Sequence, residues 1–218
     1  MNMELITLQE NNQQEVVEKV ACALRGGKIV AVSTDTVYGF IADATNQEAI
    51  ERMYALKDRT PEKAFPVFVR DIAMARWFAY VSDAKAKFLE NVWPGQVTTI
   101  FNHKEKLPNV LTAGRDTIGM RVPNSSFLSA LLDHINIPVA QSSANISGMP
   151  PAMTTEEIIA SFEARKQKPD VVIDGGKLSG MPSTIIDFTS QEPRIIRSGL
   201  VNKEELDGLL VRLQKSLG

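Results

Sequence analysis

Hydrophobic positions along this chain follow two alternating periods, one typical of helices and one typical of strands. Residues 13–25 repeat apolar positions at helical spacing and end at Gly26-Gly27, a common helix stop. Residues 28–33 form a short apolar run typical of a buried strand. We expect further strands at residues 65–69, 97–101, 117–122, 137–141, 170–173, 183–188 and 194–197, and further helices after the capping residues Asn46, Asp71, Ser82, Ser125 and Thr154 and from Asn202.

The order of these segments predicts an α/β fold. Strands come close together in the sequence near residues 95–122 and 170–197, so a mixed sheet is favoured over a purely parallel one. The 218 residues contain no internal repeat and no low-complexity segment. We therefore expect a single domain over residues 1–218, with a core at about 13–200 and a C-terminal helix at about 202–216.

Composition and charge narrow the class of protein. Hydrophobic residues make up 44% and charged residues 23% of the chain, as in an ordinary globular domain. The formal net charge of −2 argues against a general nucleic-acid or membrane-surface binder, which would carry a basic excess. The N-terminus does not have the pattern of a signal peptide, and the apolar region at residues 16–32 is interrupted by charges that exclude a membrane span. These features predict a cytoplasmic protein.

Cysteine and histidine are scarce in the sequence. The single Cys22 excludes an internal disulfide framework and a cysteine metal cluster. Its apolar neighbours predict a buried thiol on a helix face rather than a reactive nucleophile. His103 and His134 lie in unrelated contexts, so neither a histidine zinc site nor a Ser-His catalytic pair is expected.

The most informative polar segment is residues 142–148, SSANISG, which follows the strand expected at 137–141. It gathers three hydroxyls, an amide and a glycine at the end of a strand, where open α/β sheets bind their ligands. The alternative is an ordinary turn, because Asn, Ser and Gly are common turn residues. Other polar clusters with a similar placement favour a binding site.

Two of these clusters precede it in the chain. Residues 33–39, STDTVYG, follow a strand and offer groups for an ammonium or a hydroxyl, although a local turn explains them equally well. Residues 57–63, KDRTPEK, place three cations after a helix, a compact donor set for phosphate. The alternative is a solvated helix end whose cations complement the helix dipole.

Two further clusters involve arginines on strands. Thr117, Gly119 and Arg121 alternate along one strand and therefore share a face. An arginine among apolar residues is costly to bury unpaired, and either a structural salt bridge or a carboxylate ligand would satisfy it. Residues 182–187 and 194–199 place a hydroxyl pair and another arginine at strand ends.

The standard nucleotide-binding loops are missing from the sequence. The GGK segments at residues 26–28 and 175–177 lack the spacing and the following hydroxyl residue of G-x-x-x-x-G-K-[ST], and no G-x-G-x-x-G occurs. A nucleotide bound by this chain would therefore depend on side-chain cations.

Taken in order, these clusters resemble the YrdC-like threonylcarbamoyl-AMP synthase family. Lys57-x-Arg59 followed by Ser143-x-Asn145 is similar to the signature tetrad of that family. The resemblance covers about residues 13–200, and its shared order and spacing make it specific although each motif is weak alone. The other similar motifs are TDTVYG at 34–39, PGQVT at 94–98, RVP at 121–123, STIID at 183–187 and IRSG at 196–199.

The resemblance implies a YrdC-like fold, in which a twisted mixed sheet flanked by helices surrounds a deep, positively lined cavity. It implies synthesis of L-threonylcarbamoyladenylate and pyrophosphate from L-threonine, bicarbonate and ATP, with Mg²⁺ accompanying ATP. Other proteins would then transfer the threonylcarbamoyl group to adenosine 37 of tRNAs that read ANN codons, without requiring direct tRNA contact by this chain. The chain resembles the short form without an appended second domain.

The resemblance also assigns roles to individual residues, but it does not indicate metal ligands. Phe68 matches a threonine-side position, where its apolar side chain could contribute only shape or backbone contacts. The catalytic set would be Lys57, Arg59, Ser143 and Asn145; ATP would be held by Arg59, Lys63, Thr117, Ser143, Arg197 and the backbone of Pro151; and threonine would be held by Thr36, Arg121, Gln141 and Ser183.

The segment after Lys57 departs from the family pattern. Thr60-Pro61 moves the usual proline by one place, Ala64-Phe65 replaces a Pro-Leu pair, and Gln96 stands where proline is usual, so we expect a shifted loop around Lys63. Two alternatives to the enzyme remain open, a noncatalytic RNA-binding module with salt-dependent affinity and a divergent paralogue that keeps the fold without the activity. The acidic composition disfavours the first, and the complete tetrad disfavours the second.

Overall fold

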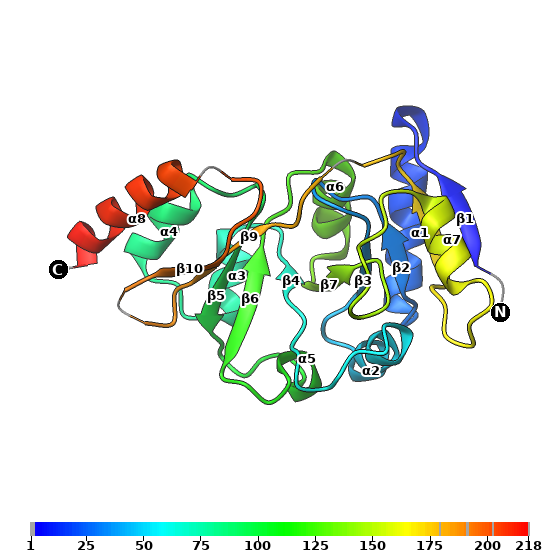
Figure 1. Cartoon of the computed structure of the whole chain (residues 1–218), viewed down its shortest axis with the longest axis horizontal. Helices are drawn as coiled ribbons and strands as arrows, with labels where there is room; N and C mark the ends of the chain where they lie inside the picture. Colours follow the sequence, from blue (N-terminus) through cyan, green and yellow to red (C-terminus); the bar gives the residue numbers. More distant parts are fainter. Residues whose placement is uncertain (1–2, 179, 191, 202, 218) are drawn as a thin grey trace.

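A computed structural model describes residues 3–178, 180–190, 192–201 and 203–217 of the protein. One twisted sheet of ten strands runs through these residues in the order β1-β8-β2-β3-β7-β4-β6-β5-β9-β10 (Figure 1). It contains both parallel and antiparallel pairs, which confirms the predicted mixed α/β sheet. The strands are β1 (Glu4–Thr7), β2 (Val30–Val32), β3 (Gly39–Asp43), β4 (Val67–Phe68), β5 (Val97–Asn102), β6 (Thr117–Arg121), β7 (Val139–Ser143), β8 (Val171–Asp174), β9 (Thr184–Asp187) and β10 (Arg194–Arg197).

Most helices begin at the positions that the capping residues in the sequence indicated. The side chains of Asn46, Asp71, Ser82, Ser125 and Thr154 each accept a backbone N–H in the first turn of a helix, which confirms these five starts. Asn202, expected to begin the last helix, lies outside the described residues. The helices are η1 (Glu10–Asn12), α1 (Gln13–Arg25), α2 (Gln47–Leu56), α3 (Ile72–Phe78), α4 (Asp83–Leu89), α5 (Asn109–Thr112), α6 (Ser126–Ile135), α7 (Thr155–Phe162) and α8 (Lys203–Leu217).

Helices cover both faces of the sheet, so its central strands are buried on both sides. In β2, Val30 and Val32 pack into a cluster with α1 and α6, whereas Ala31 points the other way, into a larger cluster with α2 and α7. Successive strand residues point to opposite faces. This double burial explains why β2 is a continuous apolar run rather than an alternating one.

The strands around the polar segments differ from the sequence prediction. β3 was not predicted, yet it pairs with both β2 and β7. β7 begins and ends two residues later than expected, because Pro138 has no N–H for the ladder and Ser143 pairs with Gly39. The SSANISG cluster therefore begins inside a strand rather than after it. The edge strand β1, parallel to β8, was also missed.

The prediction of a buried thiol at Cys22 is wrong, because Cys22 is exposed. Val17, Val20, Ala21 and Leu24 form the buried stripe of α1, and position 22 lies outside it.

Among the described residues, no helix is both long and apolar enough to cross a bilayer.

Candidate active site

A cavity of about 520 Å³ lies where several polar strand ends and loops meet. Its walls come from the segment before β3, the loop between α2 and β4, one face of β6, the end of β7 and the β9–β10 pair. Among the described residues that line it, there is no Asp or Glu. Five cations line the cavity, namely Arg59, Lys63, Arg115, Arg121 and Arg197.

The structure brings most of the predicted site residues together at this cavity. They come from segments far apart in the sequence, so only the folded sheet assembles them. Lys57 and Phe68 do not line the cavity. The predicted residues that do line it are Thr36, Arg59, Lys63, Thr117, Arg121, Gln141, Ser143, Asn145, Pro151, Ser183 and Arg197.

Arg121 reaches the cavity from β6 and is almost completely buried, with 2% of its side chain exposed. Its Nη2 atom forms a salt bridge with Asp35, and its Nε atom donates a hydrogen bond to the Gly95 carbonyl oxygen at 2.8 Å. Burial lowers the pKa of Arg121, and the Asp35 charge opposes this shift. Either a structural salt bridge or a carboxylate ligand was expected to satisfy this buried arginine, and the structure contains the salt bridge.

Hydroxyl groups line the cavity on both sides of Arg121. Thr36 Oγ1 lies 2.9 Å from Thr34 Oγ1 and 3.5 Å from Nη1 of Arg121. Ser183 Oγ, also in the cavity wall, lies 3.0 Å from Thr98 Oγ1 and accepts a hydrogen bond from Arg197 Nη2 at 3.2 Å. These hydroxyl and guanidinium groups can donate or accept hydrogen bonds, which suits a polar ligand that carries an amine, a hydroxyl and a carboxylate.

Lys57 lies behind the cavity, with only 1% of the residue exposed. Its ammonium donates hydrogen bonds to the carbonyl oxygens of Ser143 and Asn145 and, at 3.0 Å, to Asn145 Oδ1. Burial, followed by the charge of Arg59, lowers the pKa of Lys57 to about 7. Lys57 therefore fixes the end of β7 and acts on the cavity through Ser143 and Asn145.

Ser143 and Asn145 complete this network at the cavity wall. Ser143 Oγ donates to Asn145 Oδ1, and Asn145 Nδ2 donates to the Ile146 carbonyl oxygen at 3.0 Å. Three of the four tetrad residues thus touch one another directly.

Arg59 extends from the loop after α2 into the same cavity. Its Nε atom donates to the Lys63 carbonyl oxygen and its Nη2 atom to that of Ala64, both at 2.9 Å, while its guanidinium lies over the Phe65 ring. Burial lowers the pKa of Arg59. Lys63 is exposed and lines the cavity, so the altered loop still brings this residue to the site.

Phe68 is 1% exposed and packs in the core cluster beneath α1 and α6. Its ring centroid lies 5.6 Å from the guanidinium carbon of Arg121. The predicted contact of Phe68 with threonine stays a prediction, and the side chain is placed to act only through Arg121.

Sequence reasoning missed three residues of this site. Asp35 was noted only as part of a polar segment, although it pairs with Arg121. Thr98 was not singled out, although it pairs with Ser183. Arg115 lines the cavity from the loop before β6, and no local pattern in the sequence marks it.

Comparisons with known proteins agree with this geometry. The family model Sua5_yciO_yrdC, described as telomere recombination, matches residues 22–199. The threonylcarbamoyl-AMP synthase of Pyrococcus abyssi is 30% identical over 94% of this chain, and the match spans 60% of that relative's length.

Two solved structures have similar folds. The crystal structure of P. abyssi Sua5 complexed with L-threonine has a TM-score of 0.86 and 28% identity, with 96% of this chain and 61% of that chain covered. Escherichia coli YciO has a TM-score of 0.81 and 27% identity, with 92% of this chain and 97% of that chain covered. Since the family model matches most of the sequence, the chain belongs to the Sua5/YciO/YrdC family.

Proposed function

We propose that the protein synthesises L-threonylcarbamoyladenylate from L-threonine, bicarbonate and ATP. The observation that carries this proposal is the convergence of chain-distant cations, hydroxyls and the Lys57–Ser143–Asn145 network on one cavity. The similarity to a threonylcarbamoyl-AMP synthase and to a structure containing L-threonine supports it.

The reaction needs electrostatic stabilisation and alignment more than it needs an acid or a base. The threonine amine and bicarbonate form a carbamate with loss of water. A carbamate oxygen then attacks the α-phosphorus, and the bond to the β-phosphate bridging oxygen breaks, so that pyrophosphate leaves with the electron pair. Cations that face the phosphates stabilise this charge shift, and fixed binding positions hold the reacting atoms in line.

The cavity residues named by the family resemblance have roles in this proposal. Thr36, Gln141 and Ser183 bind threonine beside Arg121, whose Nη1 atom faces the threonine carboxylate. The ATP phosphates and ribose contact Arg59, Lys63, Thr117, Ser143, Arg197 and the backbone of Pro151. Mg²⁺ enters with ATP as part of the substrate, because Mg²⁺ commonly binds through substrate phosphates and few protein groups.

The product reacts further in this proposal. Threonylcarbamoyladenylate is a mixed anhydride, and downstream proteins would transfer its threonylcarbamoyl group to adenosine 37 of tRNAs that read ANN codons. The protein's own step uses small-molecule substrates and does not require tRNA contact.

The decisive experiment measures pyrophosphate release from ATP. Release should require L-threonine and bicarbonate together, and calorimetry should show that L-threonine strengthens ATP binding. Arg59→Ala and Ser143→Ala should reduce release by at least about 100-fold, because each removes a group that faces the phosphates. Release that is indifferent to threonine would reject the proposal.

A divergent paralogue is the second candidate. The displaced proline at Thr60-Pro61 favours it, because it departs from the family pattern next to Lys57 and Arg59. A paralogue would bind ATP through Arg59 and Arg197 but would show no mutual strengthening of ATP and threonine binding. The same calorimetric titration therefore separates the two candidates.

A further inference from the structure

Arg115 is a cavity residue to which the proposed chemistry assigns no task. It lies in the loop between α5 and β6 with an exposed side chain. Its backbone is fixed on both sides, because its N–H donates to the Thr112 carbonyl oxygen at 3.1 Å and its carbonyl oxygen lies 2.8 Å from His103 Nε2. The side chain thus extends from a well-defined position.

The side chains of Arg115 and Arg59 donate hydrogen bonds to the backbone of the same loop. Nη2 of Arg115 donates to the carbonyl oxygen of Glu62 at 2.9 Å, while Nε and Nη2 of Arg59 donate to those of Lys63 and Ala64. These three carbonyls belong to consecutive residues, whose Cα atoms are about 3.8 Å apart. The two guanidinium groups therefore lie at the same end of the cavity, which Lys63 also lines.

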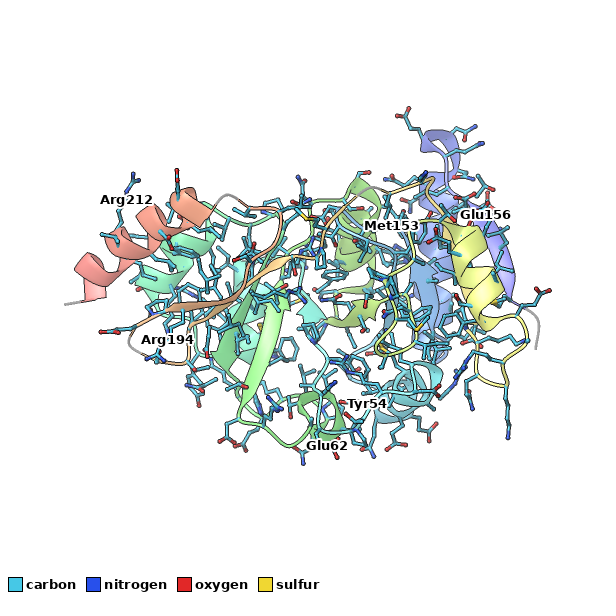
Figure 2. The ribbon with its side chains drawn as sticks, viewed as in Figure 1. Tyr54, Glu62, Met153, Glu156, Arg194 and Arg212 are labelled. Carbon is cyan, nitrogen blue, oxygen red and sulfur yellow. The ribbon has the colours of Figure 1, made fainter. Side chains whose placement is uncertain are left out.

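Tyr54 gives independent support for this placement. Its hydroxyl donates to the Lys63 carbonyl oxygen at 3.1 Å, and Tyr54 and Glu62 lie on the same side of the molecule (Figure 2). Burial raises the pKa of Tyr54, and the charges of Arg59 and Arg115 both oppose the rise, so both cations lie close to this phenol.

The three cations at this end outnumber the acidic groups near them, since the charge of Glu62 is the only acidic one among the described residues that shifts the pKa of Tyr54. In the described part of the chain, Arg59, Lys63 and Arg115 form no salt bridge, whereas Arg121 is paired with Asp35. Nε and Nη1 of Arg115 have no hydrogen-bond partner among the described residues. Three cations near one carboxylate leave a positive excess, which favours binding of an anion with several charges.

We propose that Arg115 binds the departing pyrophosphate together with Lys63, as an additional cationic ligand beyond the residues that the family resemblance assigns. This inference rests on the proposed function and deepens it. Arg115 lies in the loop that leads into β6 (Thr117–Arg121), beyond the end of that strand opposite Arg121 and therefore away from the threonine end. When the bond between the α-phosphorus and the bridging oxygen breaks, the charge left on pyrophosphate receives hydrogen bonds from Nε and Nη1 of Arg115.

The test is calorimetric titration of the whole protein with inorganic pyrophosphate and, separately, with AMP. Arg115→Ala should weaken pyrophosphate binding about tenfold and change AMP binding less than about twofold, because one charge-assisted contact to the outer phosphates is lost. Arg115→Lys should keep most of the affinity, since it keeps the charge. Arg212→Ala is the matched control, because Arg212 is an exposed arginine of α8 far from Tyr54 and Glu62 (Figure 2).

Arg115→Gln separates a charge effect from a loop-anchoring effect. Gln keeps a donor for the Glu62 carbonyl oxygen but has no charge, so it should behave like Arg115→Ala. Restored binding in Arg115→Gln, or equal weakening of pyrophosphate and AMP in Arg115→Ala, would assign Arg115 to anchoring and overturn the inference. Unchanged pyrophosphate affinity in Arg115→Ala, or a wild-type protein that binds no pyrophosphate, would overturn it as well.

The two proposals fail in different measurements. The proposed function fails if pyrophosphate release from ATP ignores threonine. The role of Arg115 fails if Arg115→Ala binds pyrophosphate as the wild type does, whether or not the wild type turns over ATP.

Discussion

Nη2 of Arg121 and Oδ1 of Asp35 form a salt bridge in which both side chains are less than one-tenth exposed. Asp35 also accepts the backbone N–H of Asn124 at 3.1 Å through its second oxygen. The pair explains how β6 carries an arginine among apolar neighbours, because a buried charge without a partner would be strongly destabilising. Nη1 of Arg121 is left to face the cavity near Thr36.

We expect Asp35→Ala to lower the free energy of unfolding by about 3–5 kcal/mol, because it leaves the Arg121 charge buried without its partner. Urea denaturation followed by circular dichroism measures the change. The double variant Asp35→Ala, Arg121→Met should be more stable than the single variant. A loss of less than about 1 kcal/mol in Asp35→Ala would show that Arg121 does not depend on this pair.

Lys57 should make stability depend on pH. Its pKa is about 7 in the folded protein against 10.5 for an ordinary lysine. Between these values the unfolded chain keeps the proton and the folded chain does not, so the free energy of unfolding should rise with pH by about 1 kcal/mol per unit. Denaturation at about pH 7, 8 and 9 measures this rise, and Lys57→Met should remove it. The same pH dependence in both proteins would contradict the prediction.

Gly180 should be intolerant of a side chain. It lies on the segment that crosses from β8 to β9 along one edge of the molecule (Figure 1), and a Cβ atom there would lie 1.8 Å from the Thr36 carbonyl oxygen. Gly180→Ala should push this segment off Thr36 and weaken threonine binding by at least about tenfold, measured by calorimetry. Gly208→Ala on α8, where a Cβ atom meets nothing, is the control and should leave binding unchanged. Wild-type affinity in Gly180→Ala would show that the segment moves freely.

Arg197 and Arg194 form a matched pair for testing the ATP site. Both are exposed arginines of β10, but only Arg197 lines the cavity, and Arg194 lies at the outer end of the molecule (Figure 2). Arg197→Ala should weaken ATP binding about tenfold, because a charge-assisted contact is lost. Arg194→Ala should bind ATP as the wild type does. Equal effects of the two substitutions would point to a general loss of positive charge.

Local signals in the sequence predicted much of the fold. Helix caps such as Asn46 and Ser125 act within a few residues, so their positions could be predicted closely. β3 was missed because its ladder depends on β2 and on β7, which follows it by about a hundred residues, and such partners leave no local pattern. Cys22 was misplaced because apolar neighbours do not reveal which side of α1 a residue occupies.

The residue types at the site could be predicted from the sequence, but the sequence did not show which of them line the cavity and which support those residues from behind. Lys57 appeared as one of three cations for phosphate, whereas it lies behind Ser143 and Asn145. Burial of that kind depends on the register of β7 against β3, which a single sequence does not determine. The partners of Arg121 and Ser183, Asp35 and Thr98, are likewise distant in the sequence.

The cavity walls come from segments far apart in the chain, so substrate binding requires the whole molecule to be folded. Thr36, Arg121 and Arg197 come from segments joined only through the complete sheet, so no proteolytic fragment should retain affinity. A ligand at about 100 times its dissociation constant should add about 2.7 kcal/mol to the stability of the intact protein. A thermal-shift screen of nucleotides and amino acids would therefore detect the substrates without any assay of turnover.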